Sequence, residues 1–478
     1  MIVPKLLTDK KRWPSRLVYR VLRVIERGTP LVERGYVRRL RRIQRKRFTQ
    51  PRERVQSNNV IVYCPNIGGH RPVYSARFID HYRDRGCQVY FIYCGILVSQ
   101  KAQKLTPFES QYLEKYRDDP NVHLVCVRDE LTRDTDELAF IVEQQRKFNA
   151  AITIFVDGDA LMDVFWRQTQ PGSPRLIGYN YAVIILIDFI YRKMSLSELW
   201  RQPVKREQWP HMMFHQYRLK HVDLIDGALC CDENLVDRMN SPRHFYLGDV
   251  CHVQPQPRND SKRSEFFART REELDQFLAR NPDKEVILQF GELEPRKGFD
   301  FLLRLVTEEP DLVLVRTGRT KPSIKIEWKS LLAKENLRVE DRLFEVEMFI
   351  DDPQLIDRLF GSIPYLLMPY KNHFRTSIMM AQALSYNKPV LVPDIGLMPT
   401  RVRKYEVGRV FKHLDYKSFK NEWSKLRHEA RAGTYTDTIR KCYRLEFSDE
   451  AFEERLEDIV AYEPAEQSRP VEVPVMQA

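Results

Sequence analysis

The stretch VILQFGELEPRKGFDFLLRLV, residues 286–306, decides the fold. Its first five residues are apolar or β-forming, which is typical of a buried strand. Two glycines and a proline then interrupt the pattern, and Phe301, Leu302 and Leu305 recur at helical spacing. A strand, a short loop and a helix in this order predict one unit of a parallel α/β sheet. Arg296 and Lys297 precede the helix, where two cations and the positive helix end could converge on an anion, although a solvated basic turn has the same composition.

The same alternation of strand-like and helix-like segments runs through most of the chain. It predicts an α/β fold of two Rossmann-like, doubly wound domains that face each other across a cleft. We place a basic helical arm at 1–57, an N-terminal domain at 58–255, a C-terminal domain at 256–445, and a closing helix with a disordered tail at 446–478. The expected strands are 60–64, 88–94, 122–127, 151–156, 183–187 and 227–231 in the first domain, and 286–290, 312–315, 343–347, 365–368, 390–392 and 409–411 in the second.

Two further loops follow expected strands and have polar or glycine-rich sequences that suit an anion. The first, PNIGGHR at 65–71, predicts a phosphate-binding turn, but many paired glycines only form tight turns. The second, PYKNHFRTS at 369–377, leads into a helix that Thr or Ser could cap with or without a function. The candidate binding residues of these loops and the following helix are Gly68, Gly69, His70, Arg71, Arg375, Thr376, Ser377 and Gln382.

Asp157 and Asp159 come directly after the apolar strand 151–156. They could chelate a divalent metal that bridges a diphosphate, or simply close the strand in an Asx turn. These alternatives stay open at the level of the sequence.

The order of these segments resembles the retaining glycosyltransferases of the GT-B fold, in particular glycosyltransferase family 4. The resemblance covers 286–412 well and 59–250 more loosely. It implies a nucleotide diphosphate-sugar donor bound by Arg296, Lys297, Arg375 and Gln382 without a metal or another cofactor. It implies a glycan or lipid-linked hydroxyl acceptor near His70, Asp157 and Asp159. Glu292 stands where the family usually has an arginine, and Phe374 and Gln382 stand where it has glutamates. A donor-binding scaffold without catalysis is therefore one alternative, and a metal-dependent GT-A-type transferase that uses Asp157 and Asp159 is another.

Charge is concentrated at the N-terminus. Residues 1–57 carry 18 Lys and Arg against four Asp and Glu, a net +14 within a chain of net +12, so the remaining residues sum to −2. A near-neutral body argues against nucleic-acid binding as its function. A basic amphipathic arm favours an anionic membrane surface, with packing on the body as the alternative. The absence of a signal-like or membrane-spanning apolar run, and eight dispersed cysteines, predict a cytoplasmic protein that is peripheral on the inner membrane face.

Overall fold

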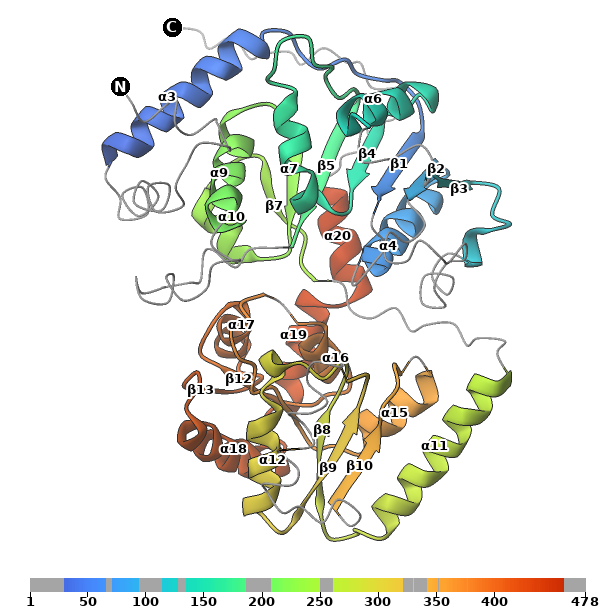
Figure 1. Cartoon of the computed structure of the whole chain (residues 1–478), viewed down its shortest axis with the longest axis vertical. Helices are drawn as coiled ribbons and strands as arrows, with labels where there is room; N and C mark the ends of the chain where they lie inside the picture. The colour runs from blue at the N-terminus through green and yellow to red at the C-terminus, as the bar shows by residue number, and fades with distance from the viewer. Residues whose placement is uncertain are drawn as a thin grey trace, which may run out of the picture.

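A computed structural model describes residues 30–65, 71–93, 114–127, 135–185, 208–249, 261–320, 330, 342–350, 352–375 and 377–459. The first part of the expected arm and the expected tail after residue 459 lie outside these ranges. The described residues form two lobes stacked along the long axis of the molecule, each built around parallel strands (Figure 1). Within the described ranges, no helix is both long and apolar enough to cross a bilayer.

The first lobe contains a parallel seven-stranded sheet in the order β3-β2-β1-β4-β5-β6-β7. Its central strands β1, β4 and β5 are nearly continuous runs of buried residues, many of them β-branched or aromatic, as expected where helices cover both faces. They are β1 (Asn59–Cys64), β2 (Gln88–Tyr93), β3 (Val122–Cys126), β4 (Ile152–Phe155), β5 (Tyr179–Ile184), β6 (Gly227–Cys230) and β7 (His244–Tyr246).

Helices cover both faces of this sheet (Figure 1). One face packs on α4 (Arg71–Arg83) and on the last described helix, α20 (Asp449–Ile459). The other packs on α3 (Pro30–Arg47), α6 (Glu137–Lys147), α7 (Gly158–Arg167), α9 (Gln208–His221) and α10 (Glu233–Met239). A single-turn helix, η1 (Glu114–Tyr116), precedes β3. The chain leaves β1 in one direction and β4 in the other, which places the topological switch point between these two strands.

The second lobe has two three-stranded parallel sheets, β10-β9-β8 and β11-β12-β13. Because β11 lies beside β8, they form one layer with a second switch point between β8 and β11. The strands are β8 (Glu285–Gln289), β9 (Leu312–Thr317), β10 (Leu343–Val346), β11 (Leu366–Leu367), β12 (Val390–Pro393) and β13 (Gly408–Phe411). The helices are α11 (Ser261–Ala279), η4 (Pro295–Lys297), α12 (Phe299–Glu308), α15 (Pro353–Gly361), α16 (Ile378–Ser385), α17 (Leu397–Tyr405), α18 (Tyr416–Arg431) and α19 (Thr436–Glu446).

The described part of the basic arm packs on the first lobe. Leu40 of α3 is fully buried, and the Gln44 side chain accepts a hydrogen bond from the Asp223 backbone N–H at 2.7 Å. Arg52, after the helix, is buried in ion pairs with Asp223 and Asp226. The opposite side of α3 is exposed and basic, so packing and an open cationic surface occur on the same helix.

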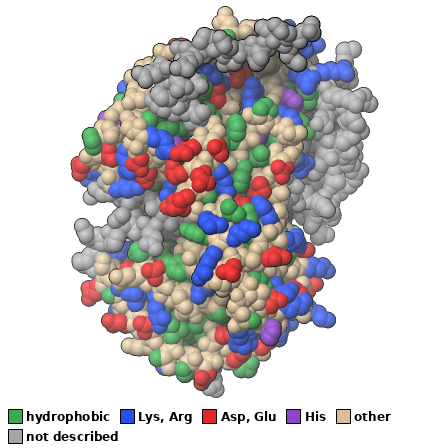
Figure 2. Space-filling model, turned by 180° about the vertical axis from the view of Figure 1, so that it is seen from behind, with side chains coloured by type: hydrophobic (Ala, Val, Ile, Leu, Met, Phe, Trp, Pro, Cys, Tyr) green, Lys and Arg blue, Asp and Glu red, His purple; other side chains and the backbone are tan. Residues whose placement is uncertain are grey.

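The chain returns to the first lobe through α20. Phe452 and Leu456 join the core beneath the sheet, and the Phe452 ring meets Phe78 edge-to-face at 5.7 Å. Three side-chain contacts then link α4 and the turn after it to α20, at intervals of one helical turn. They are the ion pairs Arg77–Asp449 and Arg85–Glu457 and, between them, the contact of the His81 ring with Glu453. Acidic and basic side chains gather across the waist of the molecule in Figure 2.

The fold class expected from the sequence is confirmed, with local differences. The short strand β7 was not predicted, because HFY between Pro242 and Gly248 is too brief to show alternation. Strand β5 begins at Tyr179, four residues before the expected start, because Tyr179 and Asn180 pair with β4 although their side chains are polar.

Leu456→Ala should lower the free energy of unfolding by about 2–5 kcal/mol, because it removes a fully buried side chain from the core that α20 shares with the sheet. Leu445→Ala is the matched control: Leu445 is 41% exposed in α19, so the same substitution there should change the value by less than about 0.5 kcal/mol. Urea unfolding followed by circular dichroism measures both. Equal effects would mean that α20 does not contribute to the core.

Candidate functional site

The loops after β8 and β11 meet at the second switch point. Gly298, in the left-handed region at φ 64°, lies so close to Pro369 that a Cβ atom would stand 1.9 Å from its carbonyl oxygen. The backbone N–H of Lys371 donates to the Arg296 carbonyl at 2.6 Å, and the Lys371 ammonium pairs with Asp300 at 2.7 Å. Two of the three loops that the sequence singled out therefore form one unit.

Lys297 lies at the centre of this unit. Its ammonium donates to the Phe290 carbonyl at 2.9 Å, and Gly291 leaves room for it at the end of β8. Burial, and secondly the neighbouring Arg296 charge, lower the pKa of Lys297 to about 8. The ammonium is thus held in place and weakly solvated. An anion that pairs with it would offset both the loss of hydration and the repulsion from Arg296.

Arg296 points outward beside the same loop. It forms an ion pair with Glu294, and its guanidinium lies 3.2 Å from His373 Nδ1 on the facing loop. About half of its side chain is exposed, which leaves it accessible to a ligand at the rim of the loop pair.

The remaining donor-side candidates surround the start of α16. Ser377 is the N-cap residue of α16, but its side chain hydrogen-bonds buried Tyr370 and makes no cap bond. Gln382 is buried on α16, and its Oε1 has no hydrogen-bond partner among the described residues. Arg375 is half-buried in the preceding loop, and Thr376 lies outside the described residues. An unsatisfied buried acceptor is costly unless a ligand donates to it, which favours a binding role for Gln382.

The backbone of Phe374 links its loop to α17. The residue is 8% exposed, and its backbone lies against Gly396, where a Cβ atom would stand 2.5 Å from the Phe374 Cα. Its carbonyl accepts a hydrogen bond from the Leu397 N–H at the start of α17, at 3.0 Å. These backbone contacts fix the loop 369–377 against α17, and the buried aromatic side chain offers no polar group.

The first switch point brings Arg71 and Asp157 together. Arg71 opens α4 after β1, Asp157 follows β4, and the two side chains pair at 2.9 Å with Asp157 only 7% exposed. Neither was linked to the other by sequence reasoning. Gly68, Gly69 and His70, the remainder of the first loop, lie outside the described residues.

The Asp159 side chain binds the backbone of the first domain. Its carboxylate accepts a hydrogen bond from the Ile185 N–H at 2.7 Å, just after β5. Gly158 permits this close approach, because a Cβ atom there would lie 2.7 Å from the Val183 carbonyl oxygen. The pair of aspartates is therefore divided: Asp157 faces Arg71, and Asp159 ties α7 to β5.

Glu137 was missed. It begins α6, and the Tyr63 hydroxyl of β1 donates to it at 3.1 Å. Burial raises the pKa of Glu137, and Asp157 adds to this effect through its negative charge. In the sequence Glu137 is an ordinary first-turn acid, and only the three-dimensional fold places it near Asp157.

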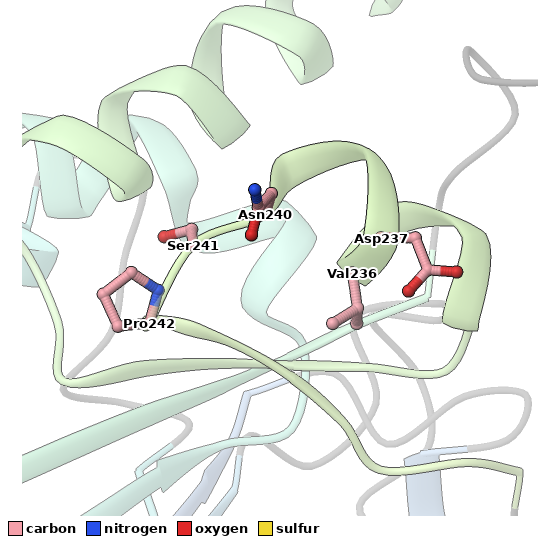
Figure 3. A pocket seen from close by; sticks show the side chains of 5 residues that line it. All are labelled: Val236, Asp237, Asn240, Ser241 and Pro242. Carbon is pink, nitrogen blue, oxygen red and sulfur yellow. The ribbon is translucent and has the colours of Figure 1, made fainter.

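No group of three metal-ligating side chains occurs within the described ranges. A surface pocket lined by Val236, Asp237, Asn240, Ser241 and Pro242 lies between the end of α10 and β7 (Figure 3). Because β7 starts there, this pocket is at the edge where the strands begin, opposite the two switch-point sites.

No protein-family model and no curated protein matches this sequence. The fold is similar to a sucrose-phosphate synthase from Thermosynechococcus elongatus, with a TM-score of 0.57 and 15% identity over 84% of this chain and 98% of the other. A glycosyltransferase from Rickettsia africae gives 0.58 at 11% identity over 85% and 99%. HepE of Anabaena, solved with UDP, gives 0.55 at 13% identity over 84% and 99%.

These likenesses establish the fold. The chain has the two-domain architecture of GT-B glycosyltransferases, as the resemblance in the sequence implied. The two-lobed fold also removes the basis of the GT-A alternative, which did not account for the second parallel domain.

Gly298→Ala should lower the free energy of unfolding by about 3 kcal/mol or more. The added Cβ disfavours the left-handed backbone and also forces the Pro369 loop away. Gly433→Ala is the matched control in the same domain, because Gly433 has φ 72° with nothing within 4 Å of its Cβ position, and it should lose only about 1–2 kcal/mol. Equal losses in denaturant titrations would contradict the close contact of the two loops.

Proposed function

We propose that this protein transfers a sugar from a nucleoside diphosphate-sugar to a hydroxyl group of a glycan or lipid-linked acceptor. The observation that carries the proposal is the contact between the β8 and β11 loops, which places half-buried Lys297 at the switch point of the second domain. Ligands of parallel α/β sheets bind at such points. The similarity in fold to glycosyltransferases, including HepE solved with UDP-glucose, supports this assignment.

On the donor side, the diphosphate would pair with Lys297 and lie within reach of Arg296, Arg375 and the N-terminal N–H groups of α16. Negative charge grows on the diphosphate as the sugar–phosphate bond breaks, so cations fixed in a poorly solvated loop stabilise the transition state more than the ground state. Gln382, whose buried side-chain oxygen lacks a hydrogen-bond partner among the described residues, would accept a hydrogen bond from a ribose hydroxyl. These charges take the place of a metal ion in the proposal.

On the acceptor side, the proposal places Asp157 at the first switch point, with Arg71 holding its carboxylate and His70 next to them in the sequence. Asp157 would orient the attacking hydroxyl. Asp159 has a supporting role here, because its carboxylate binds the Ile185 N–H. Closing the two domains would exclude water from the donor and so favour transfer over hydrolysis.

A donor-binding protein without turnover is the second candidate. Two residues favour it: Glu292 adds a negative charge beside Lys297, and the buried side chain of Phe374 offers no polar contact to a sugar. The two candidates share the donor site and differ only in turnover.

Lys297→Ala should weaken binding of UDP or another nucleoside diphosphate and lower kcat/KM for the donor sugar by about 10²–10³, because it removes the central cation. In the wild type, affinity should fall as pH rises through about 8, where the lysine loses its proton. Lys297→Arg should abolish this decline, because a guanidinium stays charged. Calorimetry from pH 6.5 to 9.5 and release of nucleoside diphosphate from labelled donors measure these effects.

Lys388 is the matched control, since burial also lowers its pKa but it precedes β12, at the edge away from the site. Lys388→Ala should leave donor affinity unchanged. Unaltered donor binding in Lys297→Ala would overturn the assigned site. Tight binding with no turnover across acceptors would favour the second candidate.

The exposed side of α3 supports a further part of the proposal, attachment to an anionic membrane surface at the inner face of the cell membrane. Leu40 holds the helix on the body while six exposed cations face away from it. They are Arg38, Arg41, Arg42, Arg45, Lys46 and Arg47. Each cation near an anionic bilayer contributes on the order of 1 kcal/mol, so a ridge of this size suffices for reversible binding.

Replacing Arg41, Arg42 and Arg45 together by Gln should weaken binding to phosphatidylserine-containing vesicles by more than about tenfold. Replacing Arg440, Lys441 and Arg444 of α19 is the control, because these exposed cations have the same spacing and charge. Donor affinity should be unchanged in both variants. Vesicle co-sedimentation at two salt concentrations measures the effect, and equal losses would show that net charge, not α3, governs binding.

A further inference from the structure

A buried cluster of charges joins the two domains. Arg401 of α17, in the second domain, has a side chain only 1% exposed, and its guanidinium reaches across to the first domain. It donates to Asp249 at 2.9 Å, to Glu233 at 3.1 Å and to the Cys231 carbonyl at 3.1 Å. These groups follow β6 and β7, at the same edge of the sheet as Asp157.

Asp249 binds helices from both domains. One carboxylate oxygen accepts from Arg401 of α17 at 2.9 Å, and the other accepts from the Tyr74 hydroxyl of α4 at 3.4 Å. Tyr74 also contacts Cys231 Sγ at 3.1 Å. Asp249 is 4% exposed, so no bulk water competes for these bonds.

Each of these helices begins at a candidate site loop. Helix α4 starts with Arg71, the partner of Asp157, one turn before Tyr74. Helix α17 starts with Leu397, whose N–H binds the Phe374 carbonyl of the donor loop, one turn before Arg401. Asp249 is thus linked to Arg71 through Tyr74 and one turn of α4. It is linked to Leu397, which binds the Phe374 carbonyl, through Arg401 and one turn of α17.

A second buried carboxylate, that of Glu446, also joins groups at the same domain junction. Glu446, at the end of α19, is buried and binds the hydroxyls of Tyr246 and Tyr405 and the ammonium of Lys404. Tyr246 is the last residue of β7 in the first sheet, and its hydroxyl also accepts from Arg401 at 3.1 Å. Rotation of α17 against the first domain would therefore break several charge-assisted bonds together.

We propose that Asp249 and Arg401 are positioning residues that set the distance between the donor loop, here residues 369–375, and the Arg71–Asp157 pair on the acceptor side. They thereby determine how often the donor sugar is passed to the acceptor and how often to water. The inference rests on the proposed transfer function. In both reactions the bond from the anomeric carbon to the diphosphate oxygen breaks, and a new bond forms to the attacking oxygen. The proton of that oxygen goes to the released diphosphate or to solvent.

A buried ion pair suits this role better than it suits stabilisation. Its Coulomb energy is largely offset by desolvation, so it adds little to stability compared with an apolar contact of the same size. Its bonds are directional, however, and a few tenths of an ångström at the junction are carried to both loops. Misplacement by about 1 Å lowers the rate of a positioned reaction by about a hundredfold.

The acidity of Asp249 gives a readout specific to positioning. Burial raises the pKa of Asp249 to about 6, although the Arg401 charge opposes this effect. Between the ordinary aspartate value and about 6, the folded protein binds the proton more readily than the unfolded chain, so acidification through this range does not lower stability through Asp249. Acidification does, however, neutralise the Asp249 carboxylate that pairs with Arg401. The other charged or titratable groups at the junction are Tyr74, Cys231, Glu233, Tyr246, Arg401, Lys404, Tyr405, Glu446 and Arg455.

The test uses the full chain with Asp249→Asn and, separately, Arg401→Lys. We expect the ratio of glycosyl transfer to donor hydrolysis to fall at least tenfold in each, while the donor dissociation constant changes less than twofold. In the wild type the ratio should fall as pH drops through about 6, and Asp249→Asn should remove this dependence. The readouts are labelled product, free sugar and nucleoside diphosphate, measured from pH 5 to 8.

The matched control is the buried pair Arg52–Asp226, which lies in the first domain at the edge where the strands begin. Asp226→Asn should lower stability without altering the transfer ratio. An unchanged ratio in Asp249→Asn, or an equal change in Asp226→Asn, would overturn the inference. If the wild type turns over no donor, the proposed function fails. Small-angle scattering then tests the inference alone: Asp249→Asn must broaden the arrangement of the domains, and an unchanged profile refutes it.

Discussion

The right-handed connection between parallel strands is the constraint on which the rest of this structure depends. Because every connection has the same hand, covering both faces of a sheet requires the chain to leave β1 and β4 in opposite directions, and β8 and β11 likewise. Each domain therefore opens at one point of its carboxyl edge. The charged groups of the candidate site lie at those two points. Arg71 and Asp157 pair at the first, and Lys297 is held between loops at the second. The fold therefore selects the positions, and the side chains decide only what is bound there.

Much of this arrangement follows from the sequence, for a physical reason. A strand buried on both faces must be apolar along nearly its whole length, and the loop after it must turn within a few residues. The segment VILQF followed by GELEPRKG therefore predicts both the strand and the candidate site. Lys297 could be identified because it stands beside Arg296 at the start of a helix that directly follows a buried strand, where cations and the helix end converge on an anion. Pairings between distant segments could not be predicted. Nothing in the sequence links Arg71 to Asp157, Glu137 to Tyr63 or Arg401 to Asp249, because these contacts exist only after the chain has folded.

The two domains carry charge in different ways, and the difference matches their proposed parts. The proposed donor side presents one cation, Lys297, whose charged form is disfavoured: burial and the Arg296 charge lower its pKa, so a diphosphate can stabilise the charged form. The acceptor side presents a carboxylate that is already paired, because Arg71 holds Asp157 and fixes its direction. An attacking hydroxyl needs orientation more than it needs charge, whereas a departing diphosphate needs charge.

Phe374 shows how a change in one loop can be compensated by the framework. The family that this chain resembles has a glutamate at this position, and an aromatic ring cannot replace its hydrogen bonds. The backbone of Phe374 instead lies against Gly396, and its carbonyl accepts a hydrogen bond from the Leu397 N–H, which fixes the loop 369–377 to α17. Helix α17 is in turn held by Arg401 against the first domain. A loop without the expected glutamate is thus anchored through its backbone to the helix that also forms the domain junction. Recognition of the sugar would then depend on how the domains meet, which is the property that a buried and directional ion pair controls best.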